Sequence, residues 1–242
     1  SAMDCAKAVG ARIARPRKPV SKMKGLLKIL RLTPLTIAVP TTAGTGSETT
    51  LAAVITDSDT HHKYPINDFA LIPRYAVLDY HVTTGLPRQI TATTGMDALT
   101  HAVEAYIGGS TTKLTRRMAE EAVSRIHADL KRAYDDGSDA KARESMLRAA
   151  YCAGIAFTRS YVGYVHGVAH SLGGRYGIPH GLANAVILPY FLEEYGESCE
   201  KRLGKLARIC GIAGGDADDH AASSVFIEWV KDMYRSMEIP EK

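Results

Sequence analysis

The sequence lacks the features of several protein classes. No apolar run approaches the ~20 residues that a membrane-spanning helix needs, and no signal peptide opens the 242-residue chain. Internal repeats and low-complexity tracts are also missing. The four cysteines, Cys5, Cys152, Cys199 and Cys210, show no CxxC spacing. Such scattered cysteines predict free thiols in a reducing cytoplasm and argue against a disulfide framework. We therefore expect a cytoplasmic protein with no membrane partner.

Acidic and aromatic side chains are scarce in the first 31 residues. This segment holds nine basic residues, a single acid, Asp4, and no Phe, Tyr or Trp. A basic segment can bind nucleic acid or another polyanion, but without aromatic rings it cannot stack on bases. We therefore expect no nucleic-acid partner. A solvated face, or a surface that meets a further segment, accounts better for the charge.

The composition is that of a globular protein, with 45% hydrophobic and 23% charged residues. The length suits one large domain or two modest ones. The first third combines a helix with short β-branched runs that end at turn residues, which is typical of an α/β domain. We expect the helix over residues 4–13, strands over 35–39, 51–56 and 75–79, a polar turn over 57–64, and breaks at Pro65 and Pro73.

From about Thr84 the pattern changes to helices. Apolar residues recur there at three- and four-residue spacing, first over residues 96–106. The pair Gly173-Gly174 is expected to interrupt the helical pattern before Pro179. The expected fold class is therefore α/β plus all-α, with one domain over residues 1–83 and a helical domain over residues 84–242. We expect helices that end at Gly108 and that cover 114–130, 140–157, 181–195 and 216–237.

Histidine and carboxylate side chains recur at helical spacing. Asp97 and His101 are four residues apart, which places them one turn apart on the same helix face. His166 and His170 have the same spacing, and a Gly-Gly break before His180 lets the chain turn back. Imidazole nitrogen and carboxylate oxygen are what a catalytic transition metal needs, whereas a single pair could be no more than hydrogen-bonded histidines. We predict a metal site from Asp97, His101 and His180 with either His166 or His170, since helical phase alone does not decide between them.

A loop of small and hydroxylated residues follows the strand expected at 35–39. It reads Thr41-Thr-Ala-Gly-Thr-Gly-Ser-Glu48 and combines two glycines with several hydroxyl groups. Such a loop lets the backbone approach a ligand and offers N–H and O–H donors to phosphate or ribose. It matches neither the GxGxxG nor the Walker motif. An ordinary tight turn before a helix is the competing interpretation.

Three longer motifs resemble those of the iron-containing (group III) alcohol dehydrogenases. They are Pro40-Thr-Thr-Ala-Gly-Thr-Gly-Ser-Glu48, Gly95-Met-Asp-Ala-Leu-Thr-His-Ala-Val-Glu104, and His166-Gly-Val-Ala-His170 with Pro179-His-Gly-Leu-Ala-Asn184. They occur in the order of that family, and the resemblance covers nearly the whole chain. It implies a dehydroquinate synthase-like fold, in which a dinucleotide-binding α/β domain precedes a helical domain. Residues 1–83 would then be the C-terminal part of the former, and residues 84–242 the helical metal-binding domain.

The resemblance also implies roles for individual residues. It makes His166, not His170, the fourth ligand of a metal that is usually Fe(II) and sometimes Zn(II), beside Asp97, His101 and His180. His170 is then the histidine near nicotinamide and substrate, and we interpret it as a catalytic proton relay. Thr41, Thr42 and Thr45 match positions that contact the cofactor, and Phe157 matches one that lines the substrate pocket. We add Tyr164 as a candidate pocket wall.

The first residues depart from the family pattern. Ser1, Asp4 and Lys7 fit the end of a Gly-Gly-Gly-Ser-x-x-Asp-x-x-Lys pyrophosphate motif, so they are candidates for cofactor binding, but the glycines are absent. The strands that precede this motif in the family and its final helical segment are absent as well. We therefore expect a fragment with an incomplete nucleotide site, whose activity alone is in doubt.

The predicted function is reversible, metal-dependent hydride transfer between an alcohol and NAD(P)+, with an aldehyde or ketone as product. A metal-dependent hydrolase is the alternative enzyme, because the same ligands can activate water. A catalytically inert metal-binding fragment is the alternative without turnover. The sequence leaves open the alcohol, the choice of NAD or NADP, and the choice of iron or zinc. Family members commonly form dimers, so a homodimer is a candidate assembly.

Overall fold

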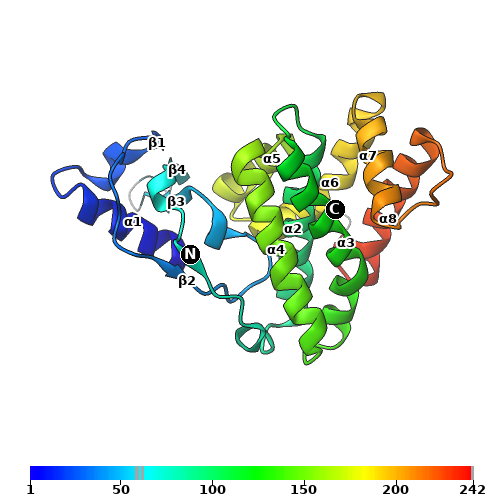
Figure 1. The fold of residues 1–242 in the computed structure, drawn as a ribbon, viewed down its shortest axis with the longest axis horizontal. Helices are drawn as coiled ribbons and strands as arrows, with labels where there is room; N and C mark the ends of the chain where they lie inside the picture. The colour runs from blue at the N-terminus through cyan, green and yellow to red at the C-terminus, as the bar shows by residue number, and fades with distance from the viewer. Residues whose placement is uncertain (58–59, 61–62, 241–242) are drawn as a thin grey trace. The chain divides into compact units, whose positions relative to one another are not determined.

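The computed structural model describes residues 1–57, 60 and 63–240 (Figure 1). It divides into two compact units. The first, here called the sheet unit, comprises Ser1–Pro40 and Ser47–Leu78; the second, the helical unit, comprises Thr41–Gly46 and Asp79–Lys242. The loop at 41–46 therefore belongs with the helices, although strands flank it in the sequence. The expected domain boundary after residue 83 stays a prediction.

The sheet unit contains one long helix and two small sheets. Helix α1 is followed by a three-stranded sheet in the order β1-β4-β3, in which β1 and β4 are parallel and β3 and β4 antiparallel. A second sheet pairs β2 with β5 in parallel. Strands β2, β3 and β5 lie within the three predicted ranges, although β2 and β5 are shorter. The elements are α1 (Ala2–Ala14), β1 (Gly25–Leu26), β2 (Ile37–Ala38), β3 (Ala52–Thr56), β4 (Lys63–Asn67) and β5 (Tyr75–Ala76), with 3-10 turns η1 (Val20–Met23), η2 (Ser47–Thr49) and η3 (Phe69–Leu71).

The expectation of a turn up to residue 64 and a break at Pro65 is wrong, because β4 occupies these positions. Residues 58, 59, 61 and 62 of the predicted turn lie outside the described part of the chain. Along β4, Tyr64 and Ile66 are buried while Lys63 and Pro65 are exposed. Proline is tolerated where a strand has no partner on its N–H side. Strand β1 runs parallel to β4 and pairs only with Ile66 and Asn67, starting with Gly25 opposite Ile66, so it has no residue opposite Pro65.

A compact core joins α1 to the three-stranded sheet. Ala11 of α1, Ala53 of β3 and Ile66 of β4 are fully buried together with Met23 and Ile29. The loop that carries Ile29 is fixed by the buried carboxylate of Asp68, which accepts hydrogen bonds from the backbone N–H groups of Ile29 (2.8 Å) and Leu30 (3.0 Å). A basic surface surrounds this loop: six cationic side chains line an open depression, namely Arg15, Arg17, Lys18, Lys22, Lys28 and Arg31.

The helical unit consists of seven α-helices and the turn η4 (Tyr80–Thr83) in the part of the chain that the structure describes. Five of the helices lie at the predicted places, and α7 falls in a stretch for which no helix was expected. The expected interruption at Gly173-Gly174 is wrong, since α5 continues to Tyr176 and ends at Gly177 in the left-handed conformation (φ 70°). The helices are α2 (Arg88–Ile107), α3 (Lys113–Asp135), α4 (Ala140–Ser160), α5 (Tyr164–Tyr176), α6 (His180–Tyr195), α7 (Glu197–Ile209) and α8 (Asp219–Ser236).

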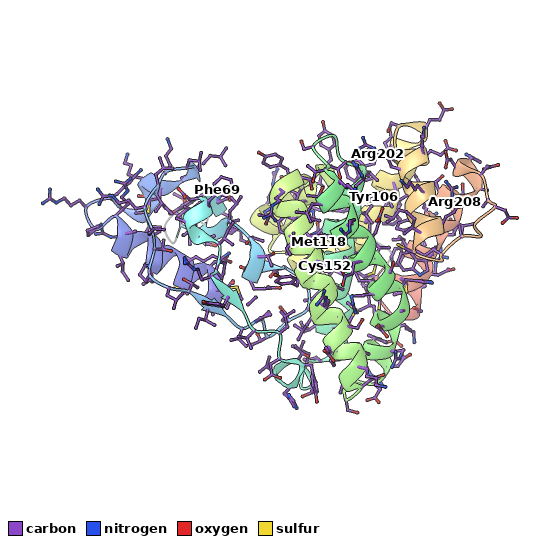
Figure 2. All side chains as sticks on the ribbon, viewed as in Figure 1. Phe69, Tyr106, Met118, Cys152, Arg202 and Arg208 are labelled. Carbon is purple, nitrogen blue, oxygen red and sulfur yellow. The ribbon has the colours of Figure 1, made fainter. Side chains whose placement is uncertain are left out.

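Helix α2 lies at the centre of this unit, and α3, α4 and α6 pack around it. Its residues from Gly95 to Tyr106 are all buried, which is the pattern of a core helix rather than a surface one. Small residues permit the close packing: an ideal Cβ at Gly95 would lie 2.3 Å from Cδ1 of Leu130 on α3. At the other end, the Arg202 guanidinium donates to the carbonyls of Ile107 and Gly108 and so stabilises the C-terminus of α2 (Figure 2). A buried central helix thus carries Asp97 and His101.

None of the helices in the described ranges combines the length and the apolar character needed to cross a membrane.

Candidate metal centre

Four side chains from three helices converge in the helical unit. Asp97 and His101 come from α2, His166 from α5 and His180 from the first residue of α6. Each offers one nitrogen or oxygen atom such that all four atoms lie within 4.8 Å of one another. Asp97, His101 and His166 are buried, whereas the His180 side chain is 38% exposed. The cluster therefore has one side through which a ligand could enter.

The distances inside the cluster suit a cation better than hydrogen bonds. Oδ1 of Asp97 lies 3.5 Å from Nε2 of His180 and 3.7 Å from Nε2 of His166. Nδ1 of His101 and Nε2 of His166 are buried without a hydrogen-bond partner among the described residues. Buried polar atoms are rarely left unpaired, and three imidazoles with one carboxylate are a donor set that binds Fe(II) or Zn(II). The residues thus fit a divalent transition metal.

The electrostatic environment of the cluster also favours a positive charge. Burial alone would raise the pKa of Asp97, but the His101, His180 and His166 rings outweigh it and hold that pKa well below its usual range. Burial, and after it the neighbouring His166, lowers the pKa of His101 well below its ordinary value. Burial would likewise lower the pKa of His166, but the Asp97 and Glu104 carboxylates outweigh it and raise that pKa to about 9. A proton on His166 balances the carboxylates, and a bound cation would take its place.

Two further residues complete the surroundings, and both escaped the sequence analysis. Glu104, buried on α2, contacts Nδ1 of His166 through Oε2 at 2.6 Å. Asn184, fully buried on α6, donates from Nδ2 to Oδ1 of Asp97 at 2.6 Å and lies 3.1 Å from Nε2 of His180. Helical spacing could have indicated both, because Glu104 lies three residues after His101 and Asn184 four after His180.

The predicted catalytic and pocket residues surround the cluster to different degrees. The exposed His170 of α5 places its ring 4.9 Å from that of His180 and 6.3 Å from that of His166. The half-buried Phe157 of α4 stacks on the His101 ring, with centroids 4.1 Å apart and planes 14° apart. Phe157 therefore covers one face of a predicted ligand. Tyr164, the first residue of α5, is 72% exposed, and its place in a pocket stays a prediction.

The loop at 41–46 is held against the helices by its glycines. An ideal Cβ at Gly44 would lie 2.7 Å from Cβ of Thr94 on α2, and one at Gly46 (φ 58°) would lie 2.7 Å from Cα of Gly154 on α4. Only glycine allows such close approach with a positive φ. Thr41 and Thr45 are exposed and Thr42 is half-buried, so the loop presents hydroxyl-bearing residues at its surface. This is compatible with the predicted cofactor contacts, which stay predictions.

The three other cofactor candidates lie on α1 of the sheet unit. Ser1 is exposed and caps the helix, because its Oγ accepts a hydrogen bond from the Asp4 N–H at 3.3 Å. Asp4 is half-buried in the first turn. Lys7, by contrast, is only 2% exposed and directs its ammonium group at protein oxygens. The structure thus gives Lys7 a structural role, and its contact with a cofactor stays a prediction.

Both parts of the chain match one protein family. Residues 91–242 match the Fe-containing alcohol dehydrogenase family, C-terminal, and residues 1–80 match iron-containing alcohol dehydrogenase. The NADPH-dependent butanol dehydrogenase of Clostridium saccharobutylicum is 37% identical over 242 residues, which are 99% of this chain and 61% of the relative. The chain thus spans about three fifths of the length of that relative.

Solved structures of similar oxidoreductases superpose on the chain. A 1,3-propanediol oxidoreductase gives a TM-score of 0.94 at 35% identity, over 98% of this chain and 62% of the other. The sulfoacetaldehyde reductase of Bifidobacterium kashiwanohense, solved in complex with NAD+, gives a TM-score of 0.86 at 29% identity, over 99% of this chain and 62% of the other. These matches confirm the expected fold class, a nucleotide-binding α/β portion followed by a helical domain.

Proposed function

Since the chain belongs to the iron-containing alcohol dehydrogenase family, we propose that it serves reversible hydride transfer between an alcohol and NAD(P)+. One observation supports this most strongly. Three imidazoles and a carboxylate bring one ligand atom each within 4.8 Å of one another, and His101 and His166 each have one ring nitrogen that is buried without a hydrogen-bond partner among the described residues. In this proposal Asp97, His101, His166 and His180 hold Fe(II) or Zn(II).

Each side chain has a task in the proposed reaction. When bound, the metal would supply a Lewis acid that lowers the pKa of the alcohol hydroxyl. The alcohol carbon gives its hydride to the nicotinamide ring and the hydroxyl gives up its proton, so that a carbonyl forms. His170, exposed beside His180, passes that proton to solvent, because an imidazole can accept a proton at one ring nitrogen and donate one from the other. Phe157 shields the His101 ring from water through the stacking described above.

Cofactor binding is proposed for two groups of residues. Thr41, Thr42 and Thr45 would meet the nucleotide at the loop, and Ser1, Asp4 and Lys7 would meet it at the start of α1. Residues 1–83 would then act as the nucleotide-binding portion and residues 84–242 as the metal-binding domain. The names of the relatives include both nucleotides, NADPH for the butanol dehydrogenase and NAD+ for the sulfoacetaldehyde reductase. We therefore propose a nicotinamide cofactor, which is either NAD or NADP.

The proposed substrate is a small alcohol or the corresponding aldehyde, as the names of the relatives suggest. Tyr164 and Phe157 are the candidate pocket walls.

We further propose a cytoplasmic homodimer. The cytoplasm is supported by four cysteines that are all free thiols. Light scattering of the purified protein and fractionation of cells test these two points.

The decisive experiment combines metal analysis with turnover. The full-length protein is purified anaerobically, loaded with Fe(II) or Zn(II), and mixed with NAD+ or NADP+ and a panel of primary and secondary alcohols. We expect growth of the reduced-nicotinamide absorbance band with at least one alcohol, and none with Asp97→Asn. Ester or phosphate hydrolysis without any change in that band would favour the hydrolase. Bound metal without binding of either nucleotide would favour an inert metal-binding protein.

A further inference from the structure

We propose that Glu104 is a positioning residue that performs two tasks with one carboxylate: it starts helix α5 and it sets the tautomer of His166. The inference depends on the proposed function to the extent that His166 is taken as a metal ligand. Glu104 lies on α2, seven residues after Asp97, and is only 4% exposed. It touches neither substrate nor metal in this proposal, and acts through His166.

Both oxygens of Glu104 are engaged with α5. Oε1 accepts a hydrogen bond from the backbone N–H of Val165 at 2.8 Å, and Oε2 lies 2.6 Å from Nδ1 of His166. The carboxylate also fills the space next to Gly163, where an ideal Cβ would lie 2.6 Å from Oε1. Any side chain at position 163 would therefore displace the carboxylate. These contacts hold the Glu104 carboxylate in one position.

The start of α5 requires an acceptor from elsewhere. The first N–H groups of a helix have no partner within the helix, and a side chain at the N-cap usually satisfies one of them. The N-cap residue of α5 is Gly163, which has no side chain. Glu104 replaces the missing cap from a different helix. Since α5 packs mainly on α6, this contact also fixes α5 relative to α2, which carries Asp97 and His101.

The same carboxylate determines which nitrogen of His166 is available. Because Glu104 accepts at Nδ1, a neutral His166 ring carries its proton there, and this leaves the lone pair on Nε2, the nitrogen that lies 3.7 Å from Oδ1 of Asp97. A neutral nitrogen with a free lone pair is what a metal ligand needs. Two donors, one from the backbone and one from the ring, thus meet two acceptor oxygens. A glutamine has only one acceptor oxygen and cannot serve both donors.

The variant Glu104→Gln separates the two tasks. Its amide oxygen can still cap Val165, but its NH2 group then faces Nδ1 of His166 and favours the tautomer with a proton on Nε2. We expect the affinity for Zn(II), measured by competition with a chelator, to fall about 10–100-fold. The wild-type protein loaded with Zn(II) should show His166 protonated at Nδ1 by ¹⁵N NMR. Glu104→Asp, which keeps two oxygens, should recover part of the affinity.

A matched control is available on α3. Glu120 accepts a hydrogen bond from the Tyr106 hydroxyl at 3.1 Å and is not a member of the cluster, so Glu120→Gln makes the same chemical change and should leave Zn(II) affinity unchanged. Equal Zn(II) affinity in Glu104→Gln and wild type would overturn the role of Glu104. Because the readout is metal affinity, a wild-type protein that binds Zn(II) but oxidises no alcohol would overturn the proposed function alone.

Discussion

At the scale of single residues, Lys7 shows how a buried side chain with an ammonium group can stabilise the fold of the sheet unit. Its ammonium group donates to the carbonyl oxygens of Ser47 (2.7 Å), Thr50 (2.8 Å) and Ala52 (3.0 Å) and to the Thr50 hydroxyl (3.0 Å). Lys7→Met keeps the length of the side chain and removes every donor. Because buried acceptors would lose their partners, we expect the sheet unit to lose about 1–3 kcal/mol of stability.

Urea unfolding of the Lys7→Met variant measures this loss. Lys18→Met is the matched control, because the half-buried Lys18 donates to a single carbonyl, that of Lys28, in a solvent-exposed hydrogen bond. Unchanged stability in Lys7→Met would show that the four contacts contribute nothing and would leave cofactor binding as the reason for a lysine at this position.

The cysteines differ enough in burial to be told apart chemically. Cys5 is exposed, whereas Cys152, Cys199 and Cys210 are buried. Burial raises the pKa of the Cys152 and Cys210 thiols to about 11, so almost none of either is thiolate at pH 8. We expect a disulfide reagent to modify Cys5 alone in the native protein and all four thiols in denaturant. Rapid native modification of Cys152 would contradict the described packing of α4.

The candidate site illustrates what residue patterns can predict. Asp97 and His101 stood out because their helical spacing is visible in the sequence, and the structure gathers them with His166 and His180; that they bind a metal stays a prediction. Helical phase could not choose between His166 and His170, since both lie on α5. Glu104 was missed because a carboxylate three residues from a histidine is common on helices, and only the fold shows that it faces α5.

At the scale of elements, the contact between α2 and α6 determines where His180 lies. An ideal Cβ at Gly181 would lie 2.6 Å from the carbonyl oxygen of Thr93 and 3.0 Å from its carbon. These are backbone atoms, so they cannot turn aside. Gly181→Ala should push α6, and His180 with it, away from α2. We expect a stability loss of about 1–3 kcal/mol from overpacking and weaker Zn(II) binding.

Thermal unfolding and chelator competition measure the two effects of Gly181→Ala. Gly174→Ala on α5 is the control, because nothing lies within 4 Å of its ideal Cβ. In the control, alanine in a helix should raise stability by about 0.4–1 kcal/mol. A Gly181→Ala variant that binds Zn(II) like the wild type would mean that α6 does not need its close approach to α2.

Local patterns predicted most elements but not all of them. The long helices were visible because their apolar residues repeat at helical spacing over several turns, as in α3 and α8. Strand β4 was missed because Pro65 reads as a break, although the alternation of Tyr64 and Ile66 with exposed neighbours is a strand pattern. Its pairing with β1 and β3 depends on contacts between distant segments, which single-sequence patterns do not contain.

At the scale of the whole molecule, the proposed metal would tie together three helices of one compact unit and none of the other. All four ligands lie in the helical unit, on α2, α5 and α6. A ligand that binds only the folded state stabilises it by about 2.7 kcal/mol at a hundredfold excess over its Kd. For the helical unit, this stabilisation corresponds to a rise in Tm of roughly 5–10 °C. The sheet unit should not respond.

Calorimetry with Zn(II) and with chelator tests this expectation. His180→Ala removes a predicted ligand, so added Zn(II) should no longer raise the Tm of the helical unit. His170→Ala removes the neighbouring histidine of α5, and the rise should persist because His170 is not counted among the ligands. If His170→Ala abolished the rise while His166→Ala kept it, the ligand set would have to be redrawn with His170 in place of His166. If Zn(II) raised the transition of the sheet unit as well, the site would extend beyond the helical unit.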